Sequence, residues 1–332
     1  MNALKSPLLG PWTTEALIFR HNRELDEQRQ SELYYRGNEV WEFTSRLFTQ
    51  MPNIRIVSLC TDWFEMPLEH IVGGLTRTTA LRELRLVQAG DMSQLLGAVC
   101  KKIPNMTALR HLYLQFSGYT SAYTKCVPPS ELEGASPDPA LEKVTLKIGN
   151  ASPIALRYIH WLTKPREGEN SYRLKSLKLD LSASYYTEFF CFDALTPCFS
   201  TLSNLSINVS GLGEGLLARV LRACHMLESL EVTVRHTFEN SMFVELPKTL
   251  RRFRVDASNE EPNWEEGDER LSTFFKIRAP RNLRQFIFHL VCYADHPSTD
   301  TLFLKSRAIA DVMGIEVIVC CAMVDGSRCI CP

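Results

Sequence analysis

The four cysteines near the carboxyl end are the residues whose spacing comes closest to metal chemistry. Cys320 and Cys321 are adjacent, and Cys329 and Cys331 follow within twelve residues. Structural zinc sites usually take their thiolates from pairs separated by about two to four residues, a pattern these cysteines do not match. Because the first pair ends an apolar stretch, we expect at least one of its thiols to be buried. We predict no metal site and no cofactor.

Nucleophilic and phosphate-binding chemistry also lacks a matching motif in the sequence. The segment 211–215 contains three glycines but not the Lys-Ser/Thr pair and spacing of a phosphate-binding loop. Cysteine–histidine pairs such as Cys60 with His70, or Cys224 with a distant histidine, have no spacing typical of a catalytic pair. We therefore predict that the chain is not an enzyme. The alternative is a hydrolase or transferase with a site in its inserted loops.

The charge balance argues against a general attraction to nucleic acid or to anionic membranes. The 332 residues include 37 Lys plus Arg and 38 Asp plus Glu, for a formal net charge of −1. The longest wholly apolar run, 317–324, has eight residues, well short of the roughly 20 that a spanning helix needs. The first residues show no secretory signal. We expect a cytoplasmic or nuclear protein with reduced cysteines.

A six-residue pattern, apolar-x-x-apolar-x-apolar, recurs nine times. Successive copies start 23 to 33 residues apart, with a mean of about 29. Between copies, apolar residues fall at helical spacing, as in Leu217, Val220, Leu221 and Cys224. The pattern predicts nine strand-and-helix units, with a degenerate tenth strand at 315–319. The nine copies are 54–59, 81–86, 109–114, 141–146, 174–179, 202–207, 227–232, 250–255 and 283–288.

The residues between the apolar positions distinguish two folds that repeat a strand and a helix. The strands of a closed (β/α)₈ barrel are buried on both faces and are therefore apolar throughout. Here the intervening residues are polar, as in Leu-Arg-Glu-Leu-Arg-Leu at 81–86. Side chains alternate between the faces of a strand, so one face must contact water. The pattern favours an open solenoid.

The Leu-x-x-Leu-x-Leu strands at this spacing resemble leucine-rich repeats of the longer, helix-containing class. The phrases at 51–54 (Met-Pro-Asn-Ile) and 103–106 (Ile-Pro-Asn-Met) are similar to the helix-end-to-strand phrase of leucine-rich-repeat F-box proteins. The resemblance implies an α/β leucine-rich-repeat solenoid, an open horseshoe with parallel strands on its concave face and helices on its convex face. An F-box is not evident before the first strand.

From these patterns we predict the domain organisation and the function. Residues 1–31 would form an N-terminal arm, 32–319 a solenoid of about nine to ten repeats, and 320–332 a cysteine-containing tail. The resemblance implies a non-enzymatic scaffold that binds a protein on its concave face. In its extended form it implies substrate recognition for a ubiquitin ligase through an adaptor. A structural subunit of a larger assembly is a further alternative.

The residues that alternate away from the core give the candidate binding surface. Tyrosine and arginine are the side chains that most often anchor protein interfaces, and the middle of this surface is locally basic. In addition, 259–270 carries six acids around Trp264 and is predicted to be a loop that could dock a basic partner. The predicted partner-binding residues are Arg85, His111, Tyr113, Lys143, Lys147, Lys178, Arg252 and Arg254.

Overall fold

The chain divides into two compact units, Met1–Leu174 and Lys175–Pro332, which are described here one at a time. Residues 117–140 and 293–300 lie outside the described residues. The computed structural model describes residues 15–20, 48, 50–61, 74–88, 103–116, 141–148, 173–180, 196–208, 216–234, 246–257, 264–292 and 302–323.

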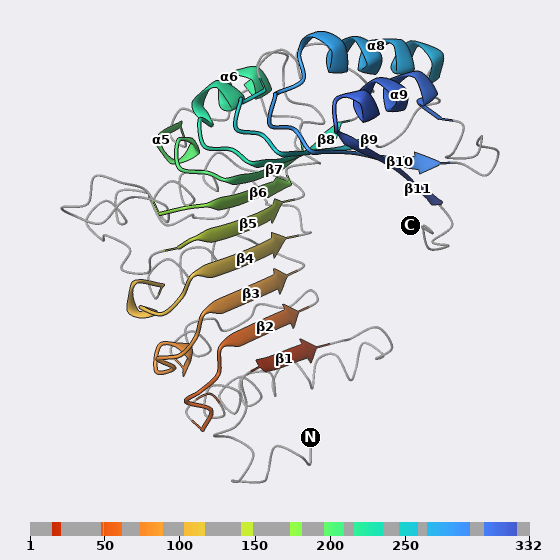
Figure 1. Cartoon of the computed structure of the whole chain (residues 1–332). Coiled ribbons are helices and arrows are strands. Elements are labelled where there is room, and N and C mark those ends of the chain that lie inside the picture. The colour runs from red at the N-terminus through yellow and green to blue at the C-terminus, as the bar shows by residue number, and fades with distance from the viewer. Residues whose placement is uncertain are drawn as a thin grey trace. The chain divides into compact units, whose positions relative to one another are not determined.

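The first unit, unit 1, contains a parallel sheet whose strands follow sequence order (Figure 1). Its register aligns the second apolar position of each copy, so that Val57, Leu84, Leu112 and Val144 form one row across the sheet. A short 3-10 helix, η3 (Ile103–Asn105), precedes β4. The strands are β1 (Glu15–Arg20), β2 (Ile56–Thr61), β3 (Glu83–Gln88), β4 (His111–Phe116) and β5 (Lys143–Ile148).

The second unit, unit 2, repeats this arrangement and adds helices on one face of the sheet (Figure 1). No helix among the described residues is long and apolar enough to cross a membrane. The helices are α5 (Thr196–Phe199), α6 (Leu216–Ala223), α8 (Trp264–Ile277) and α9 (Leu304–Val312). The strands are β6 (Ser176–Asp180), β7 (Asn204–Asn208), β8 (Ser229–Val234), β9 (Arg252–Ala257), β10 (Gln285–Cys292) and β11 (Glu316–Met323).

The nine sequence copies supply the core of both units. All 27 of their apolar positions are buried, and none is more than 4% exposed. The alternate residues of the described strands are mostly half-buried or exposed, as in the pattern of β6. A sheet buried on one face and wetted on the other is not a barrel sheet. The fold is therefore the predicted α/β leucine-rich-repeat solenoid.

A repeated backbone motif links successive copies within each unit. The carbonyl of Arg55 accepts hydrogen bonds from the amides of Arg82 and Glu83, at 2.8 and 2.9 Å. One carbonyl oxygen can serve two donors because it has two lone pairs. This satisfies the backbone at the strand starts without help from side chains. The same pair of hydrogen bonds to one oxygen recurs at the carbonyls of Arg82, Arg110, Lys175, Ser203, Glu228 and Arg251.

Both ends of the strand series extend beyond the predicted limits of the solenoid. β1 lies within the predicted arm and pairs in parallel with β2, with Ala16 opposite Val57. β11 continues past residue 319, so Cys320 and Cys321 belong to a strand and not to a separate tail. Cys320 is buried, as predicted for one of this pair. The remaining tail, 324–332, lies outside the described residues.

The prediction of a loop at 259–270 is wrong for its second half. Residues from Trp264 onward form the 14-residue helix α8. Glu265 and Glu266 lie in its first turn, where a helix favours negative charge, and its other face buries Leu271, Phe274 and Phe275. The acids that suggested a solvated loop thus stabilise a helix start. Residues 259–263 lie outside the described residues.

Candidate functional site

The polar residues of β3, β4 and β5 form three rows across the sheet of unit 1, which we call the polar strand face. Neighbouring strands of a sheet are about 4.8 Å apart, so side chains in one row are adjacent. Five of the predicted binding residues are on this face. The rows are Glu83–His111–Lys143, Arg85–Tyr113–Thr145 and Val87–Gln115–Lys147.

Glu83 is the acid at one edge of the polar strand face. Arg85 Nε donates a hydrogen bond to Glu83 Oε1 at 2.5 Å, and His111 Nδ1 lies 3.6 Å from Glu83 Oε2. The Arg85 side chain is still 49% exposed, so solvent screens this pair and leaves it weak. The Tyr113 hydroxyl donates to Gln115 Oε1 at 2.5 Å. Arg85 and Tyr113 are thus positioned on this face but not covered.

Two lysines on β5 have no acidic partner among the residues that the structure describes. Lys143 is exposed and Lys147 is half-buried. Within the part of the chain that the structure describes, neither makes an ion pair or a side-chain hydrogen bond. Thr145, which lies between them on the same face, is only 6% exposed. The two ammonium groups give this end of the polar strand face a positive charge.

In unit 2, acids hold two of the three predicted cations, Lys178 and Arg254. Lys178 Nζ on β6 donates to Glu231 Oε1 on β8 at 2.8 Å, and Arg254 Nε donates to Asp256 Oδ1 at 2.7 Å. His289 Nδ1 on β10 lies 3.5 Å from the same Asp256 oxygen. The Glu231 and Asp256 side chains are only 29% and 19% exposed. Lys178 and Arg254 are therefore less available to a partner than the lysines of β5.

The pKa values in this network reflect competition between burial and neighbouring charges. Burial acts to raise the pKa of Glu231, but the hydrogen bond and charge of Lys178, the charge of Arg254 and a hydrogen bond from Ser206 outweigh it and lower that pKa. Burial likewise acts to lower the pKa of Arg254, but the hydrogen bond and charge of Asp256 and the charge of Glu231 raise it. Both groups are thus held in their charged forms.

The Glu231 network predicts a specific dependence of stability on pH. A carboxyl group with a lowered pKa in the folded state adds stability above its unfolded pKa of about 4.3, and this contribution is lost as the pH falls through the folded pKa. Urea midpoints at pH 7 should be lower for Glu231→Gln than for the wild type. We expect the difference between the urea midpoints of the wild type and Glu231→Gln to become smaller as the pH falls below about 4.

The matched control for this prediction is Glu228→Gln. Glu228 is exposed, and it makes no ion pair or side-chain hydrogen bond among the described residues. Its substitution should leave the urea midpoint nearly unchanged at both pH values. A Glu231→Gln gap that stays constant from pH 7 to the acid range would contradict the role assigned to Glu231.

Comparisons with known proteins find structural likeness but no related sequence. No family model matches the chain, and no curated protein matches its sequence. A solved structure to which it is similar is that of the TLR13–ssRNA13 complex. The match has a TM-score of 0.43 and 16% sequence identity, and it covers 83% of this chain and 34% of that chain. This chain therefore spans about a third of the length of that protein.

Two further predicted contact residues lie at the starts of elements. Arg252 begins β9 and is exposed. Trp264 begins α8, so it belongs to a helix and not to the docking loop that the sequence suggested. Whether either residue contacts a partner stays a prediction.

Cys224 does not have the environment of a nucleophile. Burial raises the pKa of its thiol to about 12, whereas reactive cysteines have a lowered pKa. At pH 8 only about one thiol in ten thousand would then be ionised. We expect iodoacetamide to leave Cys224 unmodified in the folded chain and to alkylate it in urea, as read by peptide mass spectrometry. Stoichiometric labelling of the folded chain at pH 8 would overturn this expectation.

Most of the other residues that the sequence offered for metal binding, nucleophilic chemistry or phosphate binding lie outside the described residues. His70, Cys329, Cys331 and the 211–215 glycines are in this group. Among the residues that the structure describes, no three His, Cys, Asp or Glu side chains gather as a metal site would require.

A further group of cations lies where β9 and β10 begin. These residues are in the turns before the strands, so they are not among the predicted strand positions that face away from the core. Their signal in the sequence is the dense run of basic residues at 248–252 and 276–284. The structure places these two runs in neighbouring turns, as Asn282 Nδ2 donates to the carbonyl of Lys248 at 3.0 Å.

Proposed function

We propose that the chain is a non-enzymatic, intracellular scaffold, in the cytoplasm or nucleus, that binds a protein partner on the polar strand face of unit 1. The observation that supports this most directly is a contrast between cations on the strands of the two units. Lys143 and Lys147 have no acidic partner among the described residues, whereas Lys178 and Arg254 are paired within their own sheet. Unneutralised cations beside an available arginine and tyrosine suit a partner that carries carboxylates.

The fold supports the proposal because it holds these side chains on a rigid sheet. Each repeat packs on its neighbours, and binding residues on paired strands need little further ordering on contact. Arg85, Tyr113 and Lys143 project from three consecutive strands that are tied by continuous backbone pairing. The affinity would therefore depend on a few anchors and not on folding of the binding surface.

The proposal is tested by site-specific cross-linking in cells. A photoreactive phenylalanine analogue in place of Tyr113 should cross-link to a specific partner. The same analogue at Thr79, which is exposed in the turn before β3, should not. Adding Lys143→Glu and Lys147→Glu should lower the Tyr113 cross-link about tenfold, equivalent to about 1.4 kcal/mol, with an unchanged melting temperature. Equal cross-linking at both sites, or no effect of the lysine substitutions, would exclude this surface.

We further propose that the scaffold presents its partner to a ubiquitin ligase, as the resemblance to F-box repeat proteins implies. In this case a ligase adaptor should co-purify with the chain, and the cross-linked partner should accumulate when the chain is depleted. A partner whose level and ubiquitylation do not change on depletion would leave a binding scaffold without a ligase role.

A further inference from the structure

Six cations crowd the end of unit 2 where β9 and β10 begin. All six side chains are exposed, and they come from the turns before these two strands and from the end of α8. They are separate from the candidate surface described above, which belongs to unit 1. We call this set the basic end, and its members are Lys248, Arg251, Lys276, Arg278, Arg281 and Arg284.

Backbone hydrogen bonds hold these residues in adjacent turns. The carbonyl of Arg251 accepts the amides of Arg284 and Gln285, at 2.8 and 3.1 Å. The carbonyl of Phe274 accepts the amides of Arg278 and Ala279, at 2.8 and 2.9 Å, which ends α8 beside the same turn. The basic end is therefore a fixed cluster built on the solenoid framework.

The fold does not neutralise this charge. Among the described residues, none of the six cations makes an ion pair or a side-chain hydrogen bond. Glu228, before β8, takes the position of Arg251 in the preceding repeat, and Glu316, at the start of β11, lies opposite Gln285, one position after Arg284. Like charges in adjacent turns that no acid neutralises repel one another.

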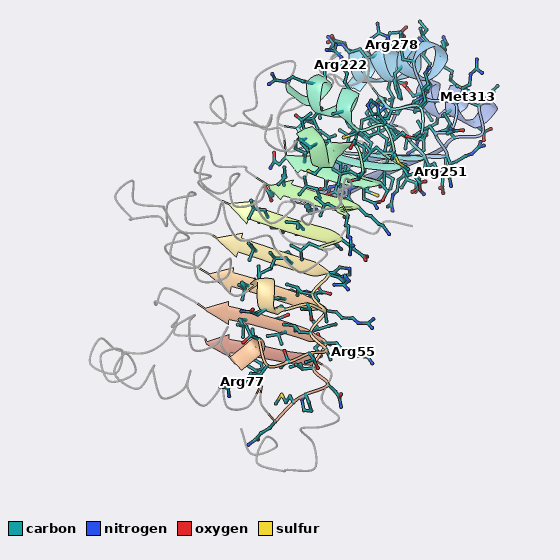
Figure 2. The ribbon with its side chains drawn as sticks, turned by 90° about the vertical axis from the view of Figure 1, so that its left-hand side faces the viewer. Arg55, Arg77, Arg222, Arg251, Arg278 and Met313 are labelled. Carbon is teal, nitrogen blue, oxygen red and sulfur yellow. The ribbon has the colours of Figure 1, made fainter. Side chains whose placement is uncertain are left out.

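Exposed apolar side chains lie at the same end of unit 2. α8 and α9 lead into the parallel strands β10 and β11, so both helices end where the strands begin. Ile277 at the end of α8 is 73% exposed, and Val312 and Met313 at the end of α9 are 88% and 42% exposed. Figure 2 shows Arg251 and Met313 on the right-hand side of this unit, with Arg278 above them. Exposed cations and exposed apolar groups thus lie at the same end of unit 2.

We propose that the basic end docks an acidic segment of a partner protein that also carries apolar side chains. Arginine forms paired hydrogen bonds with carboxylates, and four of the six cations are arginines. Apolar residues of the segment would cover Ile277, Val312 and Met313, which are otherwise left in water. A folded solenoid offers these groups preorganised, so little ordering opposes binding.

The surrounding charges favour a protein segment over a nucleic acid or a membrane. Glu228 takes the position of Arg251 in the preceding repeat, and Ile315 takes the position of Arg284 in the following one. The basic column therefore spans two repeats, or about 10 Å, which is short for a phosphate backbone. The exposed large apolar residues among those described include no aromatic ring on which a base could stack. Asp311 and Glu316 are exposed beside Val312 and would be repelled by an anionic lipid surface.

The test uses the full-length chain and two fluorescein-labelled peptides. One peptide of about 14 residues, the length of four helical turns, alternates glutamate with leucine and serine. The other has the same sequence with every glutamate replaced by glutamine. Fluorescence anisotropy should show binding of the acidic peptide only, with an affinity that falls as NaCl rises from about 50 to about 300 mM. Arg278→Glu with Arg281→Glu should weaken this binding about tenfold or more.

Two control variants separate this surface from others on the chain. Arg55→Glu with Arg77→Glu changes two exposed arginines of unit 1 and should leave the affinity unchanged. Lys143→Glu with Lys147→Glu changes the polar strand face and should also leave the affinity for the acidic peptide unchanged. The basic end and the polar strand face are thus tested by different variants, and either proposal can fail without the other. Circular dichroism melting should show that all three variants are folded.

Three outcomes would overturn the proposal. The first is equal binding of the acidic and glutamine peptides, and the second is binding that Arg278→Glu with Arg281→Glu does not affect. The third is tighter binding of a single-stranded RNA oligonucleotide, or of vesicles containing about 30% phosphatidylserine, that is lost in the same variant. That result would assign the basic end to a nucleic acid or to a membrane.

Discussion

Replacing Phe286 by alanine is expected to lower the free energy of unfolding by about 3–5 kcal/mol. Phe286 is on β10, is 0% exposed and lies at the centre of an aromatic cluster. Its ring packs edge-to-face against Phe253 and Phe275, with centroids 5.4 Å away in both cases, and Phe274 and Phe288 lie at 6.3 and 6.4 Å. Truncation would leave a cavity that the surrounding rings cannot fill.

Urea unfolding followed by far-ultraviolet circular dichroism measures this effect. Phe286→Leu should lower the free energy of unfolding less than Phe286→Ala does, because leucine keeps most of the buried volume. Val312→Ala is the exposed control, since Val312 is 88% exposed and its truncation should change stability by less than about 0.5 kcal/mol. A loss below about 1 kcal/mol for Phe286→Ala would mean that the cluster is not part of the cooperative core.

Replacing Asp268 by alanine is expected to cost about 1–3 kcal/mol, the second largest effect. The residue before α9 is Phe303, which has no side chain that can cap a helix and is in the left-handed conformation at φ 59°. Asp268 of α8 supplies the cap instead: its carboxylate accepts the amides of Ser306 at 2.8 Å and Lys305 at 3.1 Å. The Ser306 hydroxyl, fully buried, also bonds to Asp268.

The same unfolding measurement applies, with two comparison variants. Asp268→Asn keeps an acceptor but loses the charge, so its stability should fall between the wild type and Asp268→Ala. Asp311→Ala removes an exposed acid near the other end of α9 and should have little effect. If Asp268→Ala and Asp311→Ala were equally stable, the cap would not contribute to the stability of α9.

The boundaries that the sequence prediction missed have local causes. β1 was overlooked because its alignment with β2 puts Thr13 where the other copies have their first apolar residue. α8 was taken for a loop because its first turn is acidic, although Leu271, Phe274 and Phe275 have helical spacing. In both cases the apolar spacing was present, but a polar residue at one expected apolar position, or an acidic first turn, made the element look irregular.

The interactions between charged groups could not be read from the sequence. Lys178 and Glu231 are 53 residues apart, and nothing in the spacing indicates that they form an ion pair. The same holds for the cap on α9, where Asp268 is 38 residues from Ser306. Such contacts depend on which repeats are neighbours and on which residues share a row of the sheet.

The sequence by itself determined the repeat, the strand register and the buried face. Each copy carries its own apolar positions, and within each unit each strand pairs in parallel with the strand of the next copy. Tertiary structure decided which polar groups are neutralised. It pairs Lys178 and Arg254 within their own sheet, leaves Lys143 and Lys147 without acids among the described residues, and brings the turns at 248–252 and 276–284 together. The physical reason is that burial follows local periodicity, whereas charge pairing depends on the neighbour that the fold supplies.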